Sequence, residues 1–211
     1  MAEHLSDEEQ VEALKRWWSE NGKSVVGGVL LGLALVGGWR GWQYYEQNRA
    51  EIAGARYDEL LVAAESRQLD RAVQLAEGLR AEFDDTAYAS LAALHAAKLK
   101  LEAGDRGAAQ VHLAWVRANA PDPGLRQVAT LRLGRILVDE GELDAAQRLV
   151  DAAPRDAFAP EFAELRGDLA RARGDLQAAR AAYEEALAGK PASGVLLRMK
   201  LEDLPAGGGK S

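Results

Sequence analysis

One apolar stretch near the N-terminus stands out from a chain that otherwise mixes hydrophobic and polar positions. Residues 24–39 carry no charged side chain, and Lys23 and Arg40 bound them. A helix of this length rises about 24 Å, which is less than the roughly 30 Å hydrocarbon core of a bilayer. Rings that favour the membrane interface extend the stretch at both ends; they belong to Trp17, Trp18, Trp39, Trp42, Tyr44 and Tyr45. The pattern therefore predicts a transmembrane anchor over residues 24–45.

Three other interpretations of this stretch compete with an anchor. A cleaved signal peptide needs a short basic leader, whereas the 23 residues before the stretch include six acids. A buried core helix is disfavoured by the glycines at positions 27, 28, 32, 37 and 38, which lower helix propensity in water but are tolerated in lipid. A helix lying in the membrane interface needs a polar face, and residues 24–39 have none.

The glycines of the stretch are spaced for close contact between helices. Gly28 and Gly32 form one GxxxG pair, and Gly37 and Gly41 form another. Such pairs let two helices approach closely in a bilayer. We therefore expect these four residues to pack against a helix of another protein or of a second copy, which would make a homo-oligomer. The alternative is a span that is simply rich in glycine.

The residues before the stretch predict a short amphipathic helix. Ser6 stands at the N-cap position with Glu9 three residues later, and apolar residues then recur at helical spacing. The helix is expected to end near Asn21-Gly22. Residues 1–23 would then form a cytoplasmic tail that either rests on the lipid surface or docks onto a membrane partner.

The charges beside the stretch do not orient it. Equal numbers of basic residues flank the two ends: Lys15, Arg16 and Lys23 before it, and Arg40, Arg49 and Arg56 after it. The positive-inside rule therefore gives no preference. An uncleaved signal-anchor more commonly leaves a short N-terminal tail inside the cell, so we expect the large domain to lie outside the cytoplasm.

From about Glu46 onward the chain repeats itself. Residues 104–109, 141–146 and 174–179 share a Gly-acidic-x-x-Ala-Ala pattern, and residues 67–72 form a degenerate fourth copy. The steps of 37, 37 and 33 residues lie close to the 34-residue period of tetratricopeptide repeats. The last copy also resembles that consensus at Gly167, Gly174, Ala179, Tyr183, Ala186 and Pro191, although Arg166 stands where a leucine is usual.

These patterns predict an all-α fold, with an N-terminal transmembrane helix followed by a tetratricopeptide-repeat-like α-solenoid over residues 46–204. Glycine ends the first helix of each repeat and an acid begins the second, since a left-handed residue costs glycine least and a helix N-terminus favours negative charge. Residues 205–211 are expected to be a disordered tail. Helices are predicted near residues 46–66, 69–83, 86–103, 106–119, 124–140, 143–152, 160–173, 176–189 and 194–203.

The layout as a whole resembles a known family. The run from Ser6 to Lys23, SDEEQVEALKRWWSENGK, precedes one span and four divergent repeats, and it is similar to the YfgM-like family of ancillary subunits of the bacterial SecYEG translocon. The resemblance implies anchoring in the inner membrane, with the N-terminus in the cytoplasm and the repeats in the periplasm. It also implies partnership with SecYEG and with the membrane-bound periplasmic chaperone PpiD, and a role in passing unfolded or nascent secreted proteins to folding factors. A periplasmic scaffold or regulator in envelope assembly or stress signalling is an alternative with the same architecture.

Candidate chemistry is sparse. The chain has no cysteine, which excludes thiol catalysis, disulfides and thiolate metal sites. His95 and His112 lie on adjacent predicted helices and could meet, but two histidines alone make a poor metal site. Residues 207–211 imitate the end of a phosphate-binding loop without its earlier glycine. We therefore expect no enzyme activity, no cofactor and no metal, and the net charge of −5 from Glu46 onward disfavours nucleic acid.

Binding remains, and the repeat register points to a groove on the concave face of the solenoid. The first helices of successive repeats are expected to direct three sets of residues inward: Leu91, Leu94, Lys98 and Leu101; Val128, Leu131, Arg135 and Val138; and Glu161, Glu164, Asp168 and Arg171. The predicted groove is apolar in the middle and acidic toward the C-terminal end, which suits an extended or unfolded segment. The alternative is that the leucines are ordinary core residues and that the register is one position off.

Overall fold

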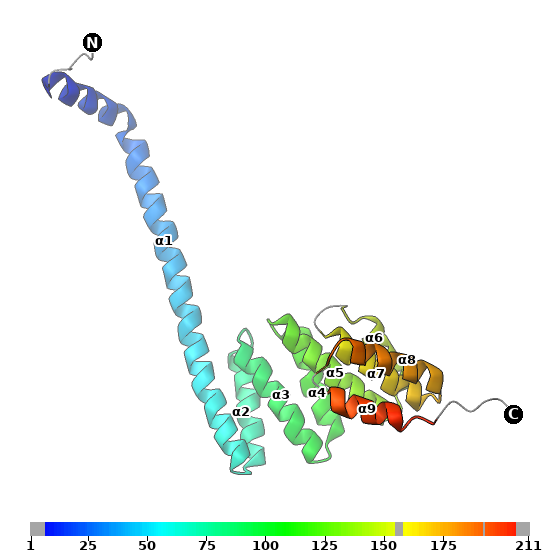
Figure 1. Cartoon of the computed structure of the whole chain (residues 1–211). Helices are drawn as coiled ribbons and strands as arrows, with labels where there is room; N and C mark the ends of the chain where they lie inside the picture. The colour runs from blue at the N-terminus through cyan, green and yellow to red at the C-terminus, as the bar shows by residue number, and fades with distance from the viewer. Residues whose placement is uncertain (1–6, 155–157, 192, 206–211) are drawn as a thin grey trace. The chain divides into compact units, whose positions relative to one another are not determined.

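The computed structural model describes residues 7–154, 158–191 and 193–205, and helices account for most of them (Figure 1). The all-α prediction is confirmed, since the described residues contain no β-strand. The chain divides at Ala50/Glu51 into an N-terminal unit and a repeat unit. The helices of the described residues are α1 (Asp7–Glu65), α2 (Leu69–Glu82), α3 (Ala87–Glu102), α4 (Arg106–Asn119), α5 (Pro123–Asp139), α6 (Leu143–Asp151), α7 (Ala159–Ala172), α8 (Leu176–Ala188) and α9 (Gly194–Glu202).

The N-terminal unit corrects one boundary expected from the sequence. The helix does not end near Asn21-Gly22, because α1 continues through these residues. The Asn21 side chain donates a hydrogen bond to the Trp17 carbonyl at 3.1 Å, and the Trp18 ring lies over Gly22, where an added Cβ would come within 3.3 Å of it. Helical backbone is therefore retained at the glycine, and Figure 1 shows α1 changing direction in its first part without a break.

The sequence also predicts that a helix starts near residue 46, and this prediction is wrong. No proline interrupts α1, which runs on to Glu65 and supplies the first helix of the first repeat. Within the described residues, α1 is the one helix that is long and apolar enough to cross a membrane. Its large apolar side chains are exposed, with Leu30 at 61% and Leu35 at 66%. A core helix of a soluble protein would bury such residues.

The repeat turns form as the sequence pattern predicts. Gly104, Gly141 and Gly174 have φ between +78° and +81°, a left-handed conformation that glycine adopts without a Cβ clash. Asp105 and Asp175 then cap α4 and α8, each accepting a hydrogen bond from a backbone N–H three residues later, at 3.0 and 2.9 Å. The degenerate first copy has Arg67 with φ of 57° where the others have glycine.

The core of the repeat unit is a series of clusters that each join consecutive helices. Leu60 of α1 and Leu79 of α2 pack with α3, and Leu113 of α4 packs with α3 and α5. Small residues set the closest approaches: an added Cβ on Gly134 of α5 would meet Leu165 of α7, and one on Gly167 of α7 would collide with the Tyr183 ring of α8. Each helix is therefore fixed by its neighbours in the chain, as in a solenoid.

Three expectations fall on residues that lie outside the described ones. These are the N-cap at Ser6, the disordered tail from residue 206 onward and the phosphate-loop imitation at residues 207–211.

The contact between Gly167 and Tyr183 gives a direct test of this packing. Replacing Gly167 with alanine should lower the free energy of unfolding by about 2–3 kcal/mol, because the new methyl group overpacks the α7–α8 contact. Gly78 is the matched control: it lies inside α2 with no atom within 4 Å of an added Cβ, so Gly78→Ala should be neutral or stabilise by up to about 1 kcal/mol. Urea denaturation of the detergent-solubilised chain, followed by far-UV circular dichroism, measures both changes. Equal effects of the two substitutions would contradict the packing assignment.

Candidate groove at the C-terminal end of the repeats

Five of the residues predicted to point inward meet at one groove. Arg135 and Val138 from α5 and Glu164, Asp168 and Arg171 from α7 line a space of about 420 Å³. Helix α9 closes its far side with residues that the repeat register does not assign to the groove: Ser193, Leu196 and Lys200. The register therefore brings the predicted side chains of two successive repeats together, and a third helix joins them.

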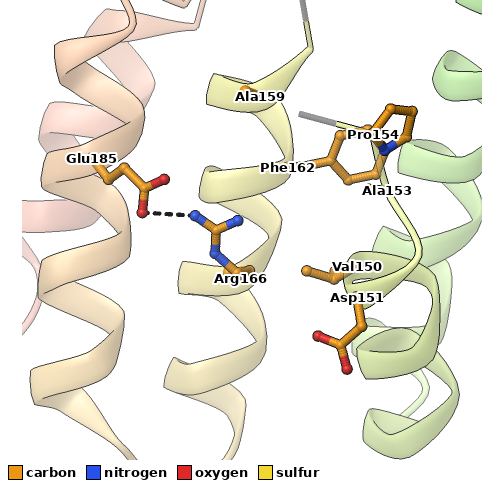
Figure 2. A pocket seen from close by; sticks show the side chains of 8 residues that line it. All are labelled: Val150, Asp151, Ala153, Pro154, Ala159, Phe162, Arg166 and Glu185. Atoms are coloured by element: carbon orange, nitrogen blue, oxygen red, sulfur yellow. Dashed lines mark ion pairs between the residues drawn. The ribbon is translucent and has the colours of Figure 1, made fainter. Parts of the chain in front are cut away.

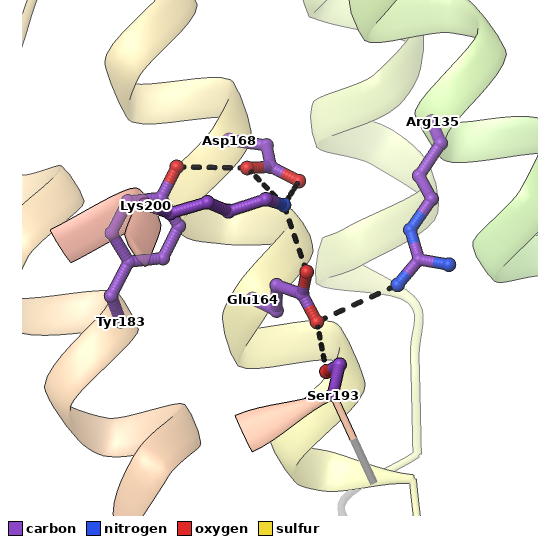
Figure 3. Close-up of polar contacts among 6 residues, drawn as sticks. All are labelled: Arg135, Glu164, Asp168, Tyr183, Ser193 and Lys200. Carbon is purple, nitrogen blue, oxygen red and sulfur yellow. Dashed lines mark hydrogen bonds and ion pairs between the residues drawn. The ribbon is translucent and has the colours of Figure 1, made fainter. Parts of the chain in front are cut away.

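A polar network links α9 to α7 inside this groove (Figure 3). The Lys200 Nζ donates hydrogen bonds of 2.8 Å to Glu164 Oε1 and to both carboxylate oxygens of Asp168. Ser193 Oγ donates to Glu164 Oε2 at 2.9 Å, and Tyr183 on α8 donates its hydroxyl hydrogen to Asp168 at 2.8 Å. Arg135 of α5 lies 3.6 Å from the same Glu164 carboxylate. The network thus ties α5, α8 and α9 to two carboxylates of α7.

Burial makes this network costly to disturb. Glu164 is 1% exposed, and burial alone would raise the pKa of its carboxyl. Hydrogen bonds from Lys200 and Ser193, with the charges of Lys200 and Arg135, outweigh that effect and lower the pKa. Burial and the bond to Asp168 also raise the pKa of the Tyr183 hydroxyl. The Glu164 carboxylate is therefore charged and paired at neutral pH.

The acidic end of the groove that the sequence predicts is consequently masked in this structure. Glu164 is buried, and both it and Asp168 bind Lys200. Sequence reasoning could not show this, because Lys200 lies more than 30 residues from its partners and the network forms only when α9 packs onto α7 and α8.

The remaining predicted residues lie in different surroundings. Leu94 and Leu131 are 6% and 5% exposed and belong to core clusters. The others retain exposed surface: Leu91 and Val128 are half-buried, while Lys98 and Leu101 are exposed. Glu161 is half-buried as well, and none of these seven residues lines the groove at α9. Leu94 and Leu131 therefore offer a partner little surface.

An aromatic cluster lies on α1 and α3 beside this predicted set. His95 Nδ1 is 3.5 Å from the Tyr57 hydroxyl, and the rings of Tyr57 and Tyr88 are 5.9 Å apart. His112 has a different partner, Arg80, whose Nη1 lies 3.3 Å from its Nδ1. The two histidines thus make separate contacts, and no group of three or more metal-ligating side chains occurs among the described residues.

A second hollow of about 500 Å³ lies between α6, α7 and α8 (Figure 2). Arg166 of α7 points into it and forms a 2.7 Å ion pair with Glu185 of α8. The arginine that replaces the usual consensus leucine is thereby accommodated by a charge on the next helix. The lining offers no set of convergent catalytic groups beyond this pair.

The two glycine pairs of α1 present open surface. An added Cβ at Gly28, Gly32, Gly37 or Gly41 would meet no atom within 4 Å. A neighbouring helix could approach the α1 backbone closely at these positions, which is the arrangement that the glycine spacing predicts.

Comparisons with known proteins agree with this architecture. The chain matches the tetratricopeptide repeat-like domain family over residues 15–206. It is 31% identical to the ancillary SecYEG translocon subunit of Haemophilus influenzae, over 97% of this chain and 100% of that protein. Proteins of the same name from Escherichia coli K12 and Neisseria gonorrhoeae are each 32% identical, covering 94% and 97% of this chain and 97% and 100% of their own lengths. No solved structure matches.

The buried histidine predicts how stability depends on pH. Burial, followed by the charge of Arg80, lowers the pKa of His112 below its usual 6.5. The unfolded chain therefore binds more protons than the folded chain below about pH 6.5, and stability falls as the pH drops. For a single residue the slope has an upper limit of about 1.4 kcal/mol per pH unit.

Urea denaturation of the full chain at several pH values between 7 and 5 measures this slope. His112→Gln keeps an acceptor for Arg80 but does not titrate, so it should flatten the dependence. Some slope should remain from His95, whose pKa is also lowered by burial and then by Lys98 and Arg132. An unchanged slope in His112→Gln would contradict the prediction.

Proposed function

We propose that this chain, which belongs to the tetratricopeptide repeat-like family of ancillary SecYEG translocon subunits, is a non-enzymatic membrane-anchored repeat protein that associates with the SecYEG translocon. The observation that carries the proposal is full-length similarity to relatives bearing that name. The exposed apolar surface of α1 supports membrane anchoring. The proposed location is the bacterial inner membrane, with residues 1–23 in the cytoplasm and the repeats in the periplasm.

We propose that the repeat unit binds translocated chains. The outward-facing residues of α3 and α5 offer apolar surface at Leu101, Val128 and Val138 beside the cations Lys98 and Arg135. A surface that mixes apolar and charged groups suits segments of varied sequence, since no single geometry is demanded. We propose that unfolded or nascent secreted proteins bind there and pass to periplasmic chaperones, including PpiD.

The glycine pairs of α1 are the proposed contact within the membrane. Gly28, Gly32, Gly37 and Gly41 have no neighbouring side chain, so a helix of SecYEG, of PpiD or of a second copy can approach them. Helix association in lipid depends on such close packing rather than on the hydrophobic effect.

Site-specific photo-cross-linking in membranes tests the partners. A photoreactive residue at Leu101 or Val138 should capture SecYEG, PpiD or a chain in transit. One at Val111, which is 62% exposed on α4, should capture these partners several times less efficiently. Leu94 and Leu131 are unsuitable positions because substitution there disturbs the core. Equal capture from all three positions would contradict binding at this surface of α3 and α5. Absence of SecYEG and PpiD from every captured set would favour the scaffold alternative.

Cysteine labelling tests the topology. The chain has no cysteine, so Val111→Cys supplies a single thiol in the repeat unit, and a cysteine in the tail before residue 23 supplies its counterpart. In intact spheroplasts a membrane-impermeant maleimide should label the first and spare the second. Labelling of the tail alone would reverse the proposed orientation.

A further inference from the structure

Helix α9 occupies the place of the first helix of a fifth repeat. Gly194 begins 35 residues after Ala159, the start of α7, which is about one repeat period. Leu197 and Leu204 are 0% and 4% exposed and pack with Tyr183 and Ala186 of α8. The chain of described residues then ends at Pro205 without a second helix.

The contact made by α9 differs from the contacts of the earlier first helices at one equivalent position of the repeat. Leu94, Leu131 and Glu164 each stand ten residues before the positive-φ glycine of their repeat, and all three are buried. The second and third repeats thus bury leucine where the fourth buries a carboxylate. That carboxylate is paired with Lys200 of α9.

At this repeat position the contact of α9 with α7 is ionic, whereas Leu94 and Leu131 lie in apolar core clusters. Elsewhere α9 is held by Leu197 and Leu204, which belong to a cluster with Ala163 of α7 and Tyr183 of α8. Separating leucines exposes apolar surface to water at a cost that nothing offsets. Separating Lys200 from Glu164 and Asp168 loses hydrogen bonds, but water then solvates all three charges and offsets much of that loss. Opening at this position therefore exposes less apolar surface than it would in the earlier repeats, and the remaining apolar contact to be separated is that of Leu197 and Leu204 with α8.

The surface of α9 fits a helix that can detach. It is nine residues long, too short to be a stable helix alone, and its N-cap Ser193 makes no capping hydrogen bond. Val195, Leu196 and Met199 are 69%, 54% and 56% exposed, so these three apolar side chains contribute little to holding the helix in place, which depends on Leu197, Leu201 and Leu204.

We propose that α9 is an autoinhibitory lid on the groove, held shut by Lys200, and that opening it uncovers an ammonium-binding site formed by Glu164 and Asp168. When the lid is closed, Lys200 of α9 occupies this site beside apolar residues. When the lid is open, the groove binds a segment of the same chemistry from another chain, which is a lysine flanked by apolar side chains. The lid deepens the proposed function and rests on it, since such segments would come from translocated chains.

Hydrogen–deuterium exchange on the full chain in detergent tests the lid. Lys200→Met should raise the exchange rates of the α9 amides by about a hundredfold or more, the effect of removing one partner of a buried ion pair, while α2–α5 keep their protection. Arg198→Met is the matched control: it removes the same charge from an exposed position of α9 that has no ion-pair partner among the described residues, and it should leave exchange unchanged. Rates in Lys200→Met within about twofold of the original chain, or a loss of protection in every helix, would overturn the proposal.

A peptide with the sequence of residues 193–205 tests the site. Labelled and followed by fluorescence anisotropy, it should bind the Lys200→Met chain at least about ten times more tightly than the original chain, whose own α9 competes at the high effective concentration of a tethered segment. A peptide carrying the Lys200→Met change should lose this binding. Equal binding of both peptides would overturn the ammonium site. Because neither SecYEG nor a client is present, failure here is distinguishable from failure of the proposed function.

Discussion

The repeat unit depends on the close approach of helices that lie one or two places apart in the chain, at positions where one of them has little or no side chain. Gly167 lets the Tyr183 ring lie against the α7 backbone, and Gly134 admits Leu165 in the same way. Each contact fixes only neighbouring helices, so the stack is built locally and an error at one step displaces every later helix. The left-handed glycines between helices serve the same purpose, because they turn the chain within one or two residues and keep each pair close.

The contact of α9 with α7 differs from the earlier contacts because it includes charge. The fourth repeat buries Glu164, and α9 meets it with Lys200 while presenting the charged Arg198 and Glu202 to solvent. This ionic contact falls inside the groove that α5, α7 and α9 line.

Local physical chemistry explains how much could be predicted from the sequence. The turns at Gly104, Gly141 and Gly174 depend on short-range backbone preference, and the helices around them lie close to their predicted ranges. The continuity of α1 was missed because Gly22 has the sequence signature of a helix end, whereas the Trp18 ring covers it in the fold. The masking of Glu164 was missed because its partners come from α5 and α9, and repeat offsets say which face a residue occupies but not which distant charge meets it.

The contrast between short-range backbone preference and charge pairing across distant helices also explains why repeat offsets alone do not predict the chemistry of the groove. The position shared by Leu94, Leu131 and Glu164 is buried in all three repeats, so a glutamate there must find a cation or lose its charge. Lys200 supplies that cation from α9, after which the described residues contain no further helix. In the proposed lid, the charge that closes the groove is one that water can solvate once α9 opens, so the state of the groove would depend on a single short helix. Such a surface would suit the proposed function, because a groove that holds segments by apolar packing alone would release them less readily.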